Sequence, residues 1–142
     1  MASDTKRLQG ACLCEAVAFE IQLPTSFVGH CHCSMCRRAH GAAYVTWVGV
    51  PAVGFSFTGG EEVLVDYRSS EHVTRRFCGR CGAPLFCNDT RHAQEVHVTL
   101  AHLKDETGLK PEAHFFFDSR ASWMDLDDDL PKLGGESGMV PL

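Results

Sequence analysis

Three cysteines fall within six residues in the segment GHCHCSMCRR, residues 29–38. Two further pairs lie outside it, in CLC at residues 12–14 and in CGRC at residues 78–81. Zinc is a borderline-soft cation that favours thiolate ligands, and a CxxC turn can direct both of its sulfurs at one ion. The three cysteine groups therefore indicate metal binding, whereas the eighth cysteine, Cys87, is expected to be a small buried hydrophobe.

The rest of the sequence favours metal over disulfide bonds. No apolar run approaches the roughly 20 residues needed to cross a bilayer, and residues 1–10 lack the apolar stretch of a secretory signal. We therefore expect a cytoplasmic protein with reduced thiols. The formal net charge of -5 gives no electrostatic reason to bind nucleic acid, so neither nucleic acid nor a membrane is an expected partner.

The cysteine spacing leaves two groupings open. In the first, the CxxC pairs at 33–36 and 78–81 form an ordinary four-cysteine zinc ribbon, and the remaining cysteines stay unused. In the second, the CLC and CGRC pairs form one closed site, and the cysteines of GHCHCSMCRR form a separate three-sulfur site. The latter would keep a fourth position open for water or substrate, as catalytic zinc requires.

A thioredoxin-like redox role for CGRC is disfavoured by the residues that follow it. Such enzymes lower a thiol pKa by placing the cysteine at a helix N-terminus. Here Gly82 and Pro84 come next, and they suit a turn into a strand better than a helix.

Alternation of apolar and polar residues predicts a mainly β chain. The expected strands cover residues 16–23, 43–50, 63–67, 72–77, 84–87, 95–100 and 113–118. Helical signal is confined to a short turn over Ser34–His40, which Gly41 should end, and to another turn over residues 101–105. From Ser122 the sequence becomes acidic and loses periodicity, so this end of the chain is expected at the surface.

Three segments in order resemble the signature of the glutathione-dependent formaldehyde-activating enzymes and centromere protein V. They are GACLC at residues 10–14, GHCHCSMCRR at 29–38 and FCGRCGAPL at 77–85. The carboxyl end, with HFFFDS at 114–119, Trp123 and Leu130-Pro131, is similar to the closing segment of that family. Three spaced cysteine motifs in order are a specific signal. The resemblance implies a single domain of the β-tent type over residues 10–133, with a lead at 1–9 and a tail at 134–142.

The resemblance also implies two zinc ions and a ligand set for each. The structural zinc would be held by Cys12, Cys14, Cys78 and Cys81, and the catalytic zinc by Cys31, Cys33 and Cys36, with its open position facing the substrate. Cys87 matches no ligand position. Iron in place of zinc is less favoured by thiolates in such turns.

The activity of the family is the condensation of formaldehyde with glutathione to S-hydroxymethylglutathione and its reversal, a carbon–sulfur lyase reaction. The resemblance therefore implies glutathione, or a related thiol, as co-substrate and a small aldehyde as its partner. Arg37 and Arg38 are candidates to bind the glutathione carboxylates, although a solvated surface pair is an equal expectation. His40 is a candidate proton carrier; it stands before Gly41, where the family usually has a small hydroxyl residue.

Alternatives to the lyase remain open at this point. His30, His32 or His40 could complete the second zinc site, which would make that site structural. The β-tent scaffold could also serve as a non-enzymatic, chaperone-like interaction module. An exposed three-thiolate site could instead exchange zinc as a carrier or sensor.

Overall fold

The structure, a computed structural model, describes residues 6–104 and 106–142. Within them β-strands predominate, and α1 (Ser34–His40) is the one α-helix of this described part. The chain forms two compact units: unit 1 comprises Met1–Ser26 and Val48–Gly108, and unit 2 comprises Phe27–Trp47 and Leu109–Leu142. The strand β4 (Val45–Pro51) carries the chain from unit 2 into unit 1.

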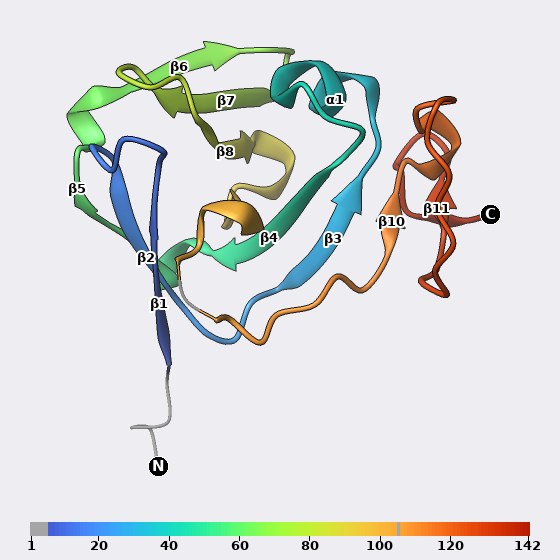
Figure 1. Cartoon of the computed structure of the whole chain (residues 1–142), viewed down its shortest axis with the longest axis horizontal. Coiled ribbons are helices and arrows are strands. Elements are labelled where there is room, and N and C mark those ends of the chain that lie inside the picture. Colours follow the sequence, from blue (N-terminus) through green and yellow to red (C-terminus); the bar gives the residue numbers. More distant parts are fainter. Residues whose placement is uncertain (1–5, 105) are drawn as a thin grey trace. The chain divides into compact units, whose positions relative to one another are not determined.

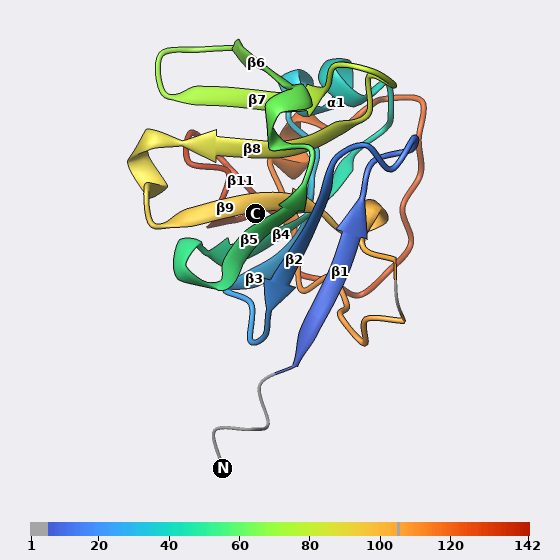
Figure 2. The ribbon, with the colours of Figure 1, turned by 90° about the vertical axis from the view of Figure 1, so that its left-hand side faces the viewer.

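Unit 1 contains a three-stranded antiparallel sheet in the order β1-β2-β5. Its strands are β1 (Arg7–Ala11), β2 (Ala18–Gln22) and β5 (Phe55–Gly59), which lie side by side in Figure 2. Alternate residues of β2 are buried, so Phe19 and Ile21 lie fully inside. The Phe19 ring stacks on Phe55 at 5.7 Å between centroids and meets Phe86 edge-on at 5.1 Å.

An antiparallel meander completes unit 1. It runs through β6 (Leu64–Arg68), β7 (Val73–Cys78), β8 (Pro84–Asp89) and β9 (Glu95–Thr99). Leu85, Phe86 and Val98 are buried in this unit. The hairpin between β1 and β2 carries CLC, and the hairpin between β7 and β8 carries CGRC, so the fold presents both cysteine pairs on turns.

Unit 2 is built on β3 (Phe27–Cys31), which pairs in parallel with β10 (His114–Phe115). A side chain at Gly29 would collide with the Phe115 ring, so this strand needs glycine there. After β3 the chain turns into α1 (Figure 1), whose last turn is closed by Gly41 in the left-handed conformation with φ of 60°. Near the carboxyl end, β11 (Leu133–Gly134) pairs with β12 (Val140–Pro141).

The structure confirms the mainly β fold and the helical turn over Ser34–His40 that Gly41 ends. It adds five strands that the pattern did not indicate. Three of them, β1, β3 and β5, each contain a glycine, and the other two are the two-residue strands β11 and β12. The strand expected over residues 113–118 is wrong beyond Phe115, because Phe116 adopts a φ of 52° and leads into a short 3-10 turn. The domain boundaries at residues 10 and 133 remain predictions. The strand β1 begins before the first of them, at Arg7.

None of the helices in the described residues is both long and apolar enough to cross a membrane.

Candidate metal centres

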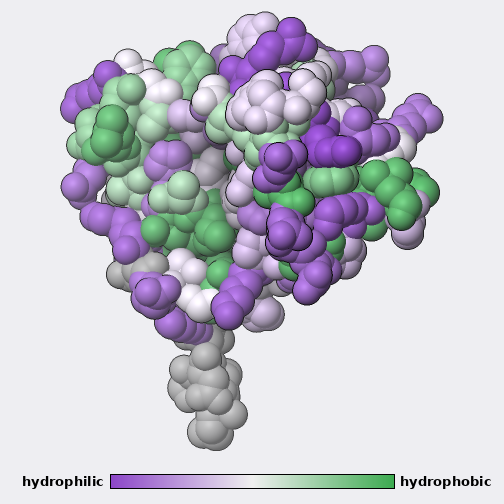
Figure 3. Space-filling model, turned by 45° about the vertical axis from the view of Figure 1, so that its right-hand side comes forward, coloured by the Kyte–Doolittle hydropathy of each residue, from purple (hydrophilic) through white to green (hydrophobic). Residues whose placement is uncertain are grey.

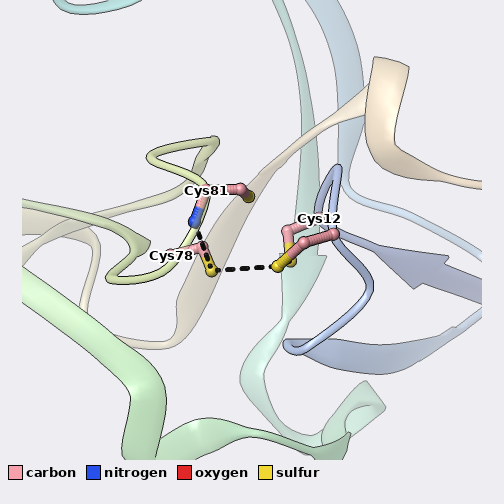
Figure 4. A group of neighbouring side chains, drawn as sticks. Cys12, Cys78 and Cys81 are labelled. Atoms are coloured by element: carbon pink, nitrogen blue, oxygen red, sulfur yellow. Dashed lines mark hydrogen bonds between the residues drawn. The ribbon is translucent and has the colours of Figure 1, made fainter.

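Four cysteine sulfurs meet in unit 1, on the two hairpin turns. The Sγ atoms of the CLC and CGRC pairs, Cys12, Cys14, Cys78 and Cys81, all lie within 4.8 Å of one another. The Sγ of Cys14 is 3.7 Å from those of Cys12 and Cys78, much farther than the roughly 2.05 Å of a disulfide bond. Figure 4 shows Cys12, Cys78 and Cys81 gathered around one centre. We call this set the four-sulfur group.

Backbone N–H groups surround these sulfurs and favour their thiolate form. The Cys78 Sγ accepts from the N–H groups of Arg80 and Cys81 at 3.3 and 3.4 Å. Although burial acts to raise the pKa of the Cys81 thiol, backbone N–H groups led by that of Ala83 outweigh it and hold this pKa at about 6. Thiolates are the species that bind metal, so the turn is built for a cation.

Four sulfurs complete the tetrahedral shell that zinc takes in closed structural sites. The residues after Cys81 confirm that this turn is not of the thioredoxin type, because they lead through Gly82 into the strand β8 instead of a helix. Since Cys14 and Cys78 are 64 residues apart, a metal held here would join two distant hairpins of unit 1.

Three further sulfurs meet in unit 2, where β3 ends and α1 begins. The Sγ atoms of Cys31, Cys33 and Cys36 lie within 4.8 Å of one another; we call them the three-sulfur group. Cys33 caps α1, and its sulfur accepts from the Cys36 N–H at 3.3 Å. Cys31 and Cys36 are buried while Cys33 is half-buried. In the described residues the sulfurs of Cys33 and Cys36 group with Cys31, whereas those of Cys78 and Cys81 group with the CLC pair, which is the second of the two groupings.

The electrostatics of the three-sulfur group call for a cation. The neighbouring thiols of Cys33 and Cys36, together with burial, raise the pKa of the Cys31 thiol. A buried thiolate beside two others is costly unless a positive ion compensates it. Three soft donors at this separation suit zinc and leave one of its four positions for another ligand.

His30 and His32, which flank Cys31, have hydrogen-bond partners other than the three sulfurs. His30 and His32 alternate with Cys31 along the chain, so they lie on the opposite side of it. The His30 Nδ1 is 2.8 Å from the Thr46 hydroxyl. Among the residues that the structure describes, no imidazole nitrogen joins the three sulfurs within the same 4.8 Å. The expectation that a histidine could complete the site therefore finds no support.

His32 belongs instead to a buried hydrogen-bonded chain. Its Nε2 is 2.8 Å from the His114 Nδ1, and the His114 Nε2 donates to the Asp128 carboxylate at 2.9 Å. Because the carboxylate only accepts, the proton of the bond to Asp128 is on the His114 Nε2. Burial, and then the His114 ring, lower the pKa of His32 to about 4. The hydrogen bond from His114 in turn holds the pKa of Asp128 below its ordinary value.

Replacing His114 by phenylalanine should lower the free energy of unfolding by about 1–3 kcal/mol. An aromatic ring is kept, but the His32 Nε2, which belongs to a fully buried side chain, loses its hydrogen-bond partner. Urea unfolding of the metal-loaded protein measures this loss, and His92→Phe at an exposed position is the control. Equal unfolding midpoints for the two variants would show that the buried chain contributes no stability.

The other predicted site residues lie on α1. Arg37 donates from Nε to the His32 carbonyl at 3.3 Å and from Nη2 to the Ser119 carbonyl at 3.0 Å, so part of its guanidinium fixes the backbone of unit 2. Arg38 is exposed. His40 is half-buried, and its ring meets the indole of Trp47 edge-on at 5.3 Å.

Three residues close to the sites were given no role from the sequence. Trp47 donates from Nε1 to the Cys36 Sγ at 3.4 Å, and His114 and Asp128 form the buried chain. His114 was expected in a strand with no assigned role, and only the parallel register of β10 with β3 brings it to His32. Cys87 is buried, as predicted.

Comparison with known proteins agrees with this geometry. The family model described as "Glutathione-dependent formaldehyde-activating enzyme" matches residues 7–119. A Halomonas elongata protein, provisionally named a glutathione-dependent formaldehyde-activating enzyme, is 27% identical over 127 residues, covering 84% of this chain and 81% of that protein. A crystal structure of a Rhodobacter sphaeroides protein matches with a TM-score of 0.60 and 27% identity, covering 73% of this chain and 92% of the other. The chain therefore belongs to the family of glutathione-dependent formaldehyde-activating enzymes.

Proposed function

We propose that the chain is a zinc-dependent carbon–sulfur lyase that acts on the glutathione adduct of formaldehyde or of another small aldehyde. The observation that carries the proposal is the separation of the cysteines into a complete four-sulfur group and a group of only three sulfurs. A structural protein needs only closed sites, whereas a catalytic zinc needs a position for its substrate. Membership of the family supplies the reaction type.

In this proposal Cys12, Cys14, Cys78 and Cys81 hold the structural zinc, and Cys31, Cys33 and Cys36 hold the catalytic one. When bound there, zinc supplies a Lewis acid that stabilises negative charge on a substrate thiolate or on the aldehyde oxygen. The chain itself fixes the three thiolates at the end of β3 and the start of α1 and buries two of them. Burial excludes water from that side of the sulfurs and strengthens their interaction with a cation.

Residues of α1 are the candidates to bind the rest of glutathione. Arg38 is exposed and can meet a carboxylate, while Arg37 keeps further N–H groups beyond the two that hold backbone carbonyls. His40 is the last residue of the same helix, and it is the candidate proton carrier near the three-sulfur group. We also propose a cytoplasmic location, where glutathione and reduced thiols coexist.

A non-enzymatic interaction module has less support. On the face drawn in Figure 3, hydrophobic side chains are interspersed with hydrophilic ones. Isolated apolar residues are ordinary on the surfaces of globular proteins and do not by themselves indicate a docking surface.

The deciding experiment follows adduct formation directly. Zinc-loaded protein is incubated with glutathione and formaldehyde, and the approach to equilibrium with S-hydroxymethylglutathione is followed by NMR exchange. We expect the protein to accelerate both directions over a protein-free control without moving the equilibrium. Protein with both sites loaded and no acceleration with formaldehyde or other small aldehydes would overturn the lyase proposal.

A further inference from the structure

The indole of Trp47 is directed at one sulfur of the three-sulfur group. Its Nε1–H donates to the Cys36 Sγ at 3.4 Å, and the two side chains are only 5% and 4% exposed. Both residues belong to unit 2. An indole N–H can donate but never accept or lose its proton under ordinary conditions, so it is a permanent donor at this position.

Burial makes this contact consequential. A buried N–H that lacks an acceptor costs free energy, so Trp47 and the Cys36 sulfur satisfy each other. When the sulfur carries negative charge the bond becomes charge-assisted and stronger. The indole therefore stabilises a thiolate at Cys36 more than a thiol, which is the direction that metal binding requires.

The indole is itself held in place by the end of α1. The ring of His40 meets it edge-on, with centroids 5.3 Å apart and planes at 89°. Cys36 belongs to the same helix as His40 and is the buried residue of that helix. A helix that carries the ligand on one turn and a supporting ring on the next fixes the direction from which the N–H approaches the sulfur.

The sulfurs of the group receive different N–H donors. Cys33 accepts from the backbone N–H of Cys36, and Cys36 accepts from Trp47. The first donor is a backbone N–H at the start of α1, so it is kept when the side chains around the site are changed. The second depends on one side chain of another element, β4, and can be removed by a single substitution.

We propose that Trp47 is a positioning residue of the open metal site: its N–H···S bond orients Cys36 and sets the charge that this sulfur donates to the metal. The proposal rests on the proposed function only in that a metal occupies the three-sulfur group. Residues that hydrogen-bond to a metal ligand typically weaken metal binding by about 10- to 100-fold when they are mutated.

The chain supplies a matched control, because its other tryptophan, Trp123, is 73% exposed. In ¹H–¹⁵N spectra the two indole signals are assigned by their loss in Trp47→Phe and Trp123→Phe. We expect the Trp47 proton to exchange with solvent far more slowly than that of Trp123, even without metal. We also expect the indole signal of Trp47, and not that of Trp123, to change its chemical shift when the three-sulfur group is loaded with metal.

Metal affinity gives an independent measurement. With the four-sulfur group loaded with zinc, Co²⁺ is titrated into the three-sulfur group and its sulfur-to-cobalt charge-transfer band is recorded. Trp47→Phe keeps a ring of similar shape but has no N–H, so we expect at least a tenfold weaker affinity and a displaced band. Trp123→Phe should match the original protein in both.

Each result decides something different. An indole proton of Trp47 that exchanges as fast as that of Trp123, or a Trp47→Phe variant with unchanged affinity and spectrum, would overturn the role of Trp47. A protein that shows the slow exchange and the cobalt band but no lyase activity would overturn the proposed function and leave this inference standing. If Trp47→Phe fails to fold, the exchange and shift of the indole signal in the original protein still decide.

Discussion

Cys78→Ser should leave unit 1 unable to hold its fold. Cys78 is fully buried, and its sulfur lies 3.7 Å from that of Cys14 on the other hairpin. A structural zinc contributes about 10–16 kcal/mol of apparent binding free energy, whereas the net stability of a domain is only about 5–15 kcal/mol. Removing one ligand weakens metal binding, and without the ion nothing balances the charge of the remaining thiolates of Cys12, Cys14 and Cys81. We expect lost chemical-shift dispersion, a lost cooperative unfolding transition and less than one metal per chain in this site.

Cys87→Ser is the matched control for that change. Cys87 lies in the same unit, on β8, and is 8% exposed, but it is not a member of the four-sulfur group. The same atomic replacement there should retain both metals and cooperative unfolding. A Cys78→Ser protein that folds and binds metal like the Cys87→Ser protein would show that the four-sulfur group does not support the fold.

Cys33→Ser should abolish activity while preserving the fold. Serine is a preferred helix N-cap, so it can replace Cys33 in accepting the Cys36 N–H at the start of α1. Its hydroxyl is a far weaker zinc ligand than a thiolate, and only two sulfurs remain. We expect the metal content to fall from two ions per chain to one. The rate of adduct formation should fall to that of the protein-free reaction.

The four-sulfur group provides the internal reference for this variant. Retained chemical-shift dispersion with one metal per chain would show that the first site is intact. Ser34→Ala, at an exposed neighbouring position, should keep two metals and full activity. If Cys33→Ser also unfolds, the three-sulfur site is structural; if it keeps two metals and its activity, Cys33 is not a catalytic ligand.

The sequence by itself determined the local parts of this protein. A CxxC turn, a helical turn ended by a glycine, and alternating strands depend on residues within a few positions of one another, so GHCHCSMCRR predicted α1 with its Gly41 end. The three cysteine motifs in order also gave the family, which the comparison confirms. Strands that contain glycine and lack clear alternation, such as β3, escaped the pattern because their burial is set by neighbouring strands.

The tertiary structure decided which distant residues meet. Spacing alone could not choose between a zinc ribbon and two separate sites, because Cys14 and Cys78 lie 64 residues apart and only the placement of two hairpins brings them together. Only the tertiary structure likewise brings the Trp47 N–H to the Cys36 sulfur and links Asp128, His114 and His32 by hydrogen bonds. Side-chain contacts of this kind depend on strand register and on which face of a strand is buried, and a one-residue slip in register would direct each of them elsewhere.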